Sequence, residues 1–280
     1  MFAADVYLIG AQKSGTTFLA SRLGRSPEVC LSDPKEPQFF SLHYQKGFDA
    51  YRRTFRDPGA RLKVDASTTY TFLRPAHRLS DGDAPGLTAP VPQRIREVAP
   101  HARLVYVMRD PVERAMSAWR HIHRGERAPD GPLSLPDVLD ADPMLELVGR
   151  YADQIERYLA EFPPERFLFL RFEDLTLRAP EVLTRLAHFL DLDEAPLLEP
   201  QQTDETHAAH GLSVAGRLAK KVPGVREAVR RRLPPAVRSR IADLVLRRPA
   251  PKVAFTGHDT AAERFASDRR RVMELTGLAV

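Results

Sequence analysis

Four short apolar runs divide the first two thirds of the chain, and each is long enough for a buried strand. They cover residues 5–10 (DVYLIG), 61–65 (RLKVD), 102–108 (ARLVYVM) and 167–172 (FLFLRF). β-Branched and aromatic side chains are frequent in these runs, and turn-forming or charged residues flank them, which is typical of strands. We therefore predict four strands in this part of the chain.

Apolar positions at helical spacing fill the intervals between the strands. The predicted helices cover residues 16–24, 45–56, 91–99, 111–124, 145–161 and 179–190. Strands that alternate with helices pair in parallel, so we expect an α/β fold. Its core would be a P-loop-like, doubly covered parallel sheet of about four to five strands, with helices on both faces. Two segments rich in Gly, Pro, Asp and Ser, 73–92 and 127–136, are predicted surface loops near the ligand end of the sheet.

Length and composition fit one globular unit. The chain has 280 residues, of which 43% are hydrophobic and 28% charged. We predict a single domain over 1–280, with a core over about 5–195 and an Arg-rich, helical C-terminal extension over about 200–280. The sequence contains no apolar stretch of membrane-spanning length, which favours a cytoplasmic protein with no membrane partner. The one cysteine, Cys30, is interpreted as a small core residue.

The positive charge of the chain is concentrated near its end. Of a formal net charge of +5, residues 217–248 hold eleven Lys or Arg against Glu227 and Asp243, with Pro223, Pro234 and Pro235 breaking the helical pattern. This run is either a solvated helical face or a surface for an acidic ligand or nucleic acid. No aromatic residues are interleaved for base stacking, so we favour the first interpretation, and a nucleic-acid partner is unlikely.

A phosphate-binding turn is predicted where the first strand meets the first helix. The segment GAQKSGTT over residues 10–17 has the spacing G-x-x-x-x-G of an NTPase phosphate loop, but Thr16 follows Gly15 where an NTPase has lysine. The lysine lies inside the loop instead, as Lys13. Backbone N–H groups at such a helix start bind anions, and Lys13 would stabilise negative charge on a bond that breaks there. The alternative is an ordinary tight turn with a solvated lysine.

A second anion site is predicted after the third candidate strand. The segment VMRDPVERAMS over residues 107–117 places Arg109 at the strand end and Ser117 two turns along the next helix. Both lie at the sheet edge where open α/β folds bind ligands, and the planar guanidinium of arginine suits a terminal phosphate. The alternative is a helix cap with a small packed serine. Two separate anion sites indicate a ligand with two phosphate-like ends.

Both segments resemble those of the sulfotransferases that use 3′-phosphoadenosine 5′-phosphosulfate (PAPS). GAQKSGTT is similar to their 5′-phosphosulfate loop and VMRDPVERAMS to their 3′-phosphate segment. KEPQFF over residues 35–40, followed by HYQKGFDAYRRTF, is similar to the heparan sulfate and bacterial glycan-type branch. With RFEDL over 171–175 and Phe189-Leu190, the resemblance spans about residues 5–195. One departure is that Ala66 and Thr68 stand where the branch often has lysine and proline, which argues against a heparan-like polyanionic acceptor.

The resemblance implies in-line transfer of a sulfuryl group from PAPS to a hydroxyl or amine of a saccharide-like or natural-product acceptor, without a metal. It gives Lys13 to the leaving oxygen, Ser14, Gly15, Thr16 and Thr17 to the 5′-phosphate, Arg109 and Ser117 to the 3′-phosphate, and Glu36 to the acceptor proton. Because an alcohol or ammonium must lose a proton as it attacks sulfur, a base is needed, and His43 is the alternative to Glu36. The loop 206–213 is expected near the adenosine, with no residue assigned.

Two other functions compete with this interpretation. A P-loop kinase or NTPase shares the fold, but it should bind Mg²⁺ through its loop Ser/Thr, and the displaced lysine argues against it. A basic protein that binds nucleic acid through residues 217–248 would show salt-sensitive binding. The sequence leaves the acceptor and the oligomeric state open.

Overall fold

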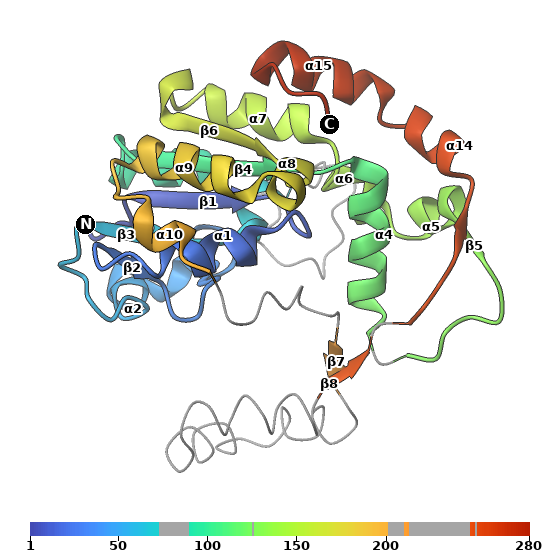
Figure 1. Ribbon diagram of the computed structural model, residues 1–280, viewed down its shortest axis with the longest axis horizontal. Coiled ribbons are helices and arrows are strands. Elements are labelled where there is room, and N and C mark those ends of the chain that lie inside the picture. Colours follow the sequence, from blue (N-terminus) through green and yellow to red (C-terminus); the bar gives the residue numbers. More distant parts are fainter. Residues whose placement is uncertain (73–89, 125, 201–209, 213–246, 250) are drawn as a thin grey trace.

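A five-stranded parallel sheet forms the centre of the protein (Figure 1). The computed structural model describes residues 1–72, 90–124, 126–200, 210–212, 247–249 and 251–280. The sheet has the order β2-β3-β1-β4-β6, with strands β1 (Val6–Gly10), β2 (Val29–Leu31), β3 (Leu62–Asp65), β4 (Arg103–Met108) and β6 (Phe167–Arg171). The predicted α/β fold is confirmed, and β2 is the strand that the apolar pattern did not single out.

Helices surround this sheet, and a further group of helices lies beside one end of it (Figure 1). Those beside the sheet are α1 (Thr16–Leu23), α2 (Phe48–Arg52), α3 (Val91–Val98), α7 (Tyr151–Leu159), α8 (Phe172–Leu177), α9 (Ala179–Leu190), α10 (Ala195–Leu198) and α15 (Ala266–Thr276). A lateral group contains α4 (Pro111–Ile122), α5 (Leu135–Ala141), α6 (Pro143–Leu147) and α14 (His258–Glu263). Short helical turns cover Phe39–His43, Tyr44–Lys46, Thr68–Thr71 (η3) and Pro164–Arg166.

Two small strand pairs accompany the main sheet. β5 (Leu133–Ser134) pairs in parallel with β9 (Phe255–Thr256), and β7 (His210–Leu212) pairs antiparallel with β8 (Arg247–Pro249).

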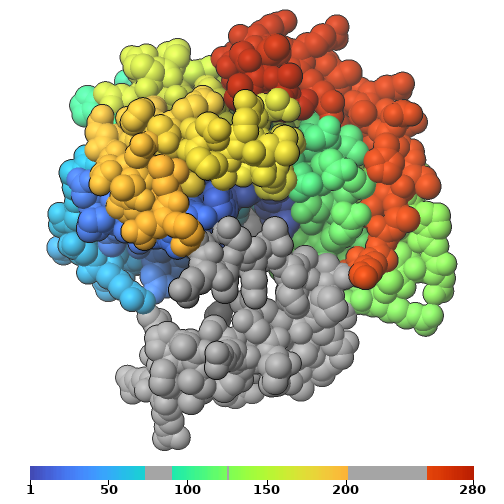
Figure 2. Space-filling model, viewed as in Figure 1, coloured from blue at the N-terminus to red at the C-terminus, as the bar shows by residue number. Residues whose placement is uncertain are grey.

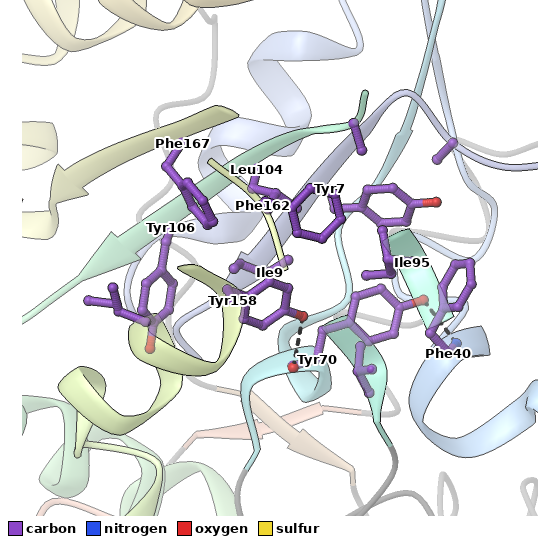
Figure 3. Packing of buried hydrophobic residues seen from close by; sticks show 14 of the residues in the cluster. Tyr7, Ile9, Phe40, Tyr70, Ile95, Leu104, Tyr106, Tyr158, Phe162 and Phe167 are labelled. Atoms are coloured by element: carbon purple, nitrogen blue, oxygen red, sulfur yellow. Dashed lines mark hydrogen bonds between the residues drawn. The ribbon is translucent and has the colours of Figure 1, made fainter. Parts of the chain in front are cut away.

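Alternating side chains of the central strands build a separate core on each face of the sheet. Tyr7 and Ile9 of β1 point toward α3 and α7, whereas Val6 and Leu8 point toward α1 and α9. All four are at most 1% exposed, and Val6, Leu8 and Ile9 each contribute about the 1.5–3 kcal/mol typical of a fully buried aliphatic side chain. Figure 3 shows the first core, in which the Tyr158 hydroxyl donates to the carbonyl oxygen of Tyr70 at 3.0 Å. The near-continuous apolar runs of the sequence reflect this burial on both faces.

The C-terminal residues pack onto the rest of the protein. α15 lies against α7, and α14 lies against α4 and α5, where Phe255, Ala261 and Phe265 join a third apolar cluster. Figure 2 shows this red segment extending along the yellow-green and green surfaces of α7 and α4. Among the polar contacts that tie α15 to the core, the Asp268 carboxylate accepts the N–H groups of Tyr151 and Ala152 at 3.0 Å, and Arg269 pairs with Asp110 at 2.6 Å.

Several predicted element boundaries were wrong. The helix predicted over 45–56 is a short turn followed by α2, with Gly47 between them at a φ of 75°. The helix predicted over 145–161 is two helices, α6 and α7, separated around Gly149, because glycine is a poor helix former. The loop predicted over 127–136 ends earlier, since β5 and the start of α5 occupy its last residues, and Phe172 opens α8 instead of ending a strand.

Other predictions concern the chain beyond these elements. Cys30 is buried in the core, as predicted. Most of the predicted loop 73–92, the loop 206–213 outside β7 and the basic run 217–248 before β8 lie outside the described residues. Among described residues the C-terminal part is not only helical, because β7, β8 and β9 belong to it. In the same residues, no helix is long and apolar enough to cross a membrane.

Candidate functional site

The residues of the candidate site follow the carboxyl ends of all five parallel strands. Lys13 follows β1, Glu36 follows β2, Thr68 follows β3, Arg109 follows β4 and Phe172 follows β6. Because parallel strands end at one edge of a sheet, five segments far apart in the sequence meet there. This edge is where ligands bind in open α/β folds.

The phosphate-binding turn has the geometry of an anion site. Lys13 and Gly15 have positive φ angles of 70° and 86°, so the backbone folds into a tight loop before α1 begins at Thr16. A Cβ at Gly15 would lie 3.1 Å from the Phe172 ring, so both the angle and the contact favour glycine. The buried Ser14 hydroxyl has no hydrogen-bond partner among the described residues. A buried orphan hydroxyl beside a helix N-terminus indicates a missing polar ligand.

The two predicted anion-binding turns lie side by side. The Ala11 N–H donates to the Val107 carbonyl oxygen at 2.7 Å, and Arg109 Nη1 donates to the Lys13 carbonyl oxygen at 3.5 Å. The guanidinium of Arg109 also stacks 4.6 Å from the Phe172 ring centroid and contacts Glu113 at 3.2 Å. The expectation that these turns meet at one sheet edge is therefore confirmed.

Positive charge accumulates around the phosphate-binding turn. The pKa of Lys13 is lowered to about 8, first by partial burial and then by the neighbouring cations Arg124, Arg109 and Lys35. An anion at the turn would offset this repulsion and restore the full charge of Lys13. The site is therefore prepared for a strongly anionic ligand.

The segment after β2 places a carboxylate next to the phosphate-binding turn. Lys35 Nζ lies 3.0 Å from Glu36 Oε1 and donates to the hydroxyls of Thr16 and Thr17, each at 3.3 Å. The Thr68 hydroxyl donates to Glu36 Oε2 at 3.2 Å. Glu36 is thus held by one cation and one hydroxyl while its side chain stays 30% exposed, which suits a group that must reach an acceptor.

A buried carboxylate anchors the segment that carries Glu36. Asp65 accepts hydrogen bonds from the hydroxyls of Tyr51 at 2.8 Å, Tyr70 at 2.6 Å and Ser67 at 2.6 Å. The Ser67 hydroxyl oxygen in turn accepts the backbone N–H of Gln38 at 2.9 Å, and the Tyr70 hydroxyl oxygen accepts that of Phe40 at 3.3 Å. This network fixes the backbone immediately after Glu36 to the end of β3.

The Asp65 network predicts a specific pH dependence of stability. Burial raises the pKa of Asp65 from 3.8 to about 6, although its three hydroxyl donors oppose the rise. The folded protein therefore binds this proton more tightly than the unfolded chain, and stability falls as the pH rises from about 4 to 6. We expect the free energy of unfolding of wild type, relative to Asp65→Asn, to increase by up to about 3 kcal/mol between pH 7 and pH 4, because asparagine does not titrate.

Urea denaturation of both proteins at several pH values measures this difference. The pKa of Asp268 is also raised to about 6 by burial, but that residue is present in both proteins and cancels. Parallel stability profiles for the two proteins would contradict the prediction.

Sequence reasoning missed one residue of α4, His121, which lies one turn after the predicted Ser117. Ser117 is half-buried on α4, and its hydroxyl makes no hydrogen bond with a described residue. His121, one turn later, is exposed, yet partial desolvation and the charges of Lys13 and Arg124 lower the pKa of its imidazole to about 4. His121 is therefore neutral near pH 7 and lies within electrostatic reach of Glu36. The i, i+4 spacing from Ser117 was the available signal.

The remaining candidates are less closely connected to this site. The His43 imidazole makes no hydrogen bond or ion pair with a described residue, although its backbone N–H donates to Gln38. In the part of the chain that the structure describes, no three His, Cys, Asp or Glu side chains are grouped to hold a metal ion. The absence of a metal from the reaction stays a prediction.

Comparison with known proteins decides the family. A family model of the sulfotransferase domain matches residues 3–208, most of the chain, including both anion-binding turns and Glu36. The chain belongs to the sulfotransferase domain family. This is the family that the two motifs predicted.

Individual relatives of this sulfotransferase fit the predicted branch at a distance. The bifunctional heparan sulfate N-deacetylase/N-sulfotransferase 1 of Caenorhabditis elegans is 29% identical over 211 residues, covering 69% of this chain and 22% of that protein. The human bifunctional heparan sulfate N-deacetylase/N-sulfotransferase 3 is 28% identical over 200 residues, covering 65% and 22%. The chain thus spans about a fifth of the length of these curated relatives.

One solved structure supports the fold. The sulfotransferase from Alicyclobacillus acidocaldarius superposes with a TM-score of 0.62 at 21% identity, covering 100% of this chain and 98% of that one. At this identity the likeness concerns the fold alone.

Proposed function

We propose that this sulfotransferase transfers the sulfuryl group of PAPS to a hydroxyl or amine of a saccharide-like or natural-product acceptor. The observation that supports the proposal most strongly is the meeting of the two anion-binding turns, where Arg109 contacts the backbone of Lys13 and the cations lower the pKa of Lys13. A donor with phosphate groups at both ends of its nucleoside would be held by the two turns together.

The proposed reaction is a direct displacement at sulfur. The acceptor oxygen or nitrogen forms a bond to sulfur while the bond between sulfur and the bridging oxygen of the 5′-phosphate breaks, which leaves adenosine 3′,5′-bisphosphate. Lys13 stabilises the charge that grows on the leaving oxygen, and Glu36 accepts the proton of the acceptor. Ser14, Thr16 and Thr17 with the N–H of Gly15 hold the 5′-phosphate.

The 3′-phosphate is assigned to Arg109 and Ser117. The Arg109 side chain is only 19% exposed, so a charge-assisted hydrogen bond from it would be screened little by water. The half-buried Ser117 lies two turns along α4, the helix that follows Arg109.

Binding of adenosine 3′,5′-bisphosphate tests the donor assignment without knowledge of the acceptor. We expect this nucleotide to raise the melting temperature without Mg²⁺, corresponding to about 2.7 kcal/mol at 100 times its Kd. Arg109→Ala should weaken the binding about tenfold or more, because a hydrogen bond to a charged group is lost. Arg178→Ala removes a surface arginine that is paired with Asp174 and should leave binding unchanged.

Other outcomes of the same measurement favour other functions. Stabilisation by ATP with Mg²⁺, and none by adenosine 3′,5′-bisphosphate, would support a kinase or NTPase. Binding of neither nucleotide together with salt-sensitive binding of DNA or RNA would support the nucleic-acid alternative.

A further inference from the structure

Lys35 occupies the boundary between the donor loop and the proposed base. Its ammonium group contacts the hydroxyls of Thr16 and Thr17 on one side and the Glu36 carboxylate on the other, at 3.3, 3.3 and 3.0 Å. It also contributes to lowering the pKa of Lys13, so its charge acts at the phosphate-binding turn. This inference rests on the proposed function, in which the sulfonate passes from the phosphate-binding turn toward the acceptor beside Glu36.

Hydrogen bonds to the Lys35 carbonyl oxygen fix the backbone from which its side chain extends. The Lys35 carbonyl oxygen accepts the N–H of buried Ala66 at 3.4 Å and the hydroxyl of Ser32 at 2.9 Å. The side chain is 26% exposed, so its stem is enclosed while its charged end reaches the site. This arrangement limits the ammonium group to the space between the loop and Glu36.

We propose that Lys35 is a catalytic residue that binds the sulfonate of PAPS during transfer. In the free enzyme its ammonium group neutralises Glu36. When the phosphosulfate occupies the loop, the ammonium group turns its N–H donors to the sulfonate oxygens, and the Glu36 carboxylate becomes available for the acceptor proton. No atom is exchanged with Lys35, which stays protonated throughout. Donor binding and preparation of the base are thereby linked through one side chain.

Adenosine 3′,5′-bisphosphate lacks the sulfonate and therefore separates this role from general support of the loop. Calorimetric titration would compare its binding with that of PAPS for wild type, Lys35→Met and Lys35→Arg. We expect Lys35→Met to weaken PAPS about tenfold or more, the effect of losing a charge-assisted hydrogen bond, and to change binding of the bisphosphate less than about threefold. Lys35→Arg should restore most of the PAPS affinity because it keeps the charge.

Lys63→Met is the matched control. Lys63 is also a partly buried lysine paired with a carboxylate, Asp5 at 2.6 Å, but it lies at the amino end of β3, away from the strand ends that form the site. It should affect both ligands equally and little.

Each remaining outcome overturns either this inference or the proposed function. Equal weakening of both ligands by Lys35→Met would place Lys35 at the 5′-phosphate, and unchanged PAPS binding would remove it from the donor site. Either result overturns the sulfonate role while the proposed function stands. Failure of wild type to bind either nucleotide would instead overturn the proposed function, and the Lys35 inference with it.

Discussion

Replacing Lys13 by methionine is expected to lower the rate of sulfuryl transfer by about 100- to 1,000-fold, the effect of removing one preorganised charge from a developing oxyanion. Lys13 has a positive φ of 70°, and methionine tolerates that backbone no worse than lysine, so the fold should persist. The measurement is transfer of ³⁵S from PAPS to extracts of candidate acceptors. Lys46→Met, at an exposed position, should transfer at the wild-type rate.

The pKa of Lys13 adds a pH signature to this prediction. A lysine is charged below its pKa, so the kcat/KM for PAPS, which reports groups of the free enzyme, should be highest below pH 8 and fall above it. This alkaline decline should be absent from the residual activity of Lys13→Met. A variant with a third or more of the wild-type rate, or with the same alkaline decline, would contradict the assignment of Lys13 to the leaving oxygen.

Replacing Glu36 by glutamine is expected to lower transfer by about 100-fold or more, the usual contribution of a general base. Glutamine has the same size and can still accept the hydrogen bond from Thr68, but it cannot take the acceptor proton. Binding of adenosine 3′,5′-bisphosphate should change little, because the proposed contacts of that nucleotide do not include Glu36. The loss should therefore lie in kcat.

Two histidines provide the comparison for Glu36. His43→Gln should transfer near the wild-type rate, since its imidazole makes no hydrogen bond or ion pair with a described residue, and His121→Gln should lose less activity than Glu36→Gln. Undiminished transfer by Glu36→Gln would remove Glu36 from the role. The histidine whose replacement then abolished activity would become the base, with His121 favoured on the structure because it is neutral near pH 7 and lies close to Lys13.

Local patterns predicted most of the sheet and both anion-binding turns. Strands β1, β3, β4 and β6 were visible because side chains on both of their faces are buried, which leaves continuous apolar runs. The Gly10–Thr17 turn was visible because its backbone geometry demands particular residues at fixed spacing. Features that depend only on a segment's own conformation or burial can therefore be predicted from the residues of that segment.

Features that depend on distant partners could not be predicted in this way. β2 has only three residues, and it is a strand because Cys30 and its neighbours pair with β3. Lys35 reaches Thr16 only because that pairing places the end of β2 beside the phosphate-binding turn. The low pKa of His121 arises first from partial desolvation in the fold and then from the charges of Lys13 and Arg124, and no local pattern contains the burial or the approach of Lys13.

The contacts that Asp268 and Arg269 of α15 make with the core affect the order in which the site can become complete during synthesis. Asp110 starts the helix behind Arg109 by accepting the N–H groups of Val112 and Glu113, and its other carboxylate oxygen pairs with Arg269. Asp268 caps α7, whose Tyr151 hydroxyl donates to the Arg109 carbonyl oxygen at 2.9 Å. During synthesis the Arg109 turn is therefore fully supported only after α15 has been made and has packed against α7.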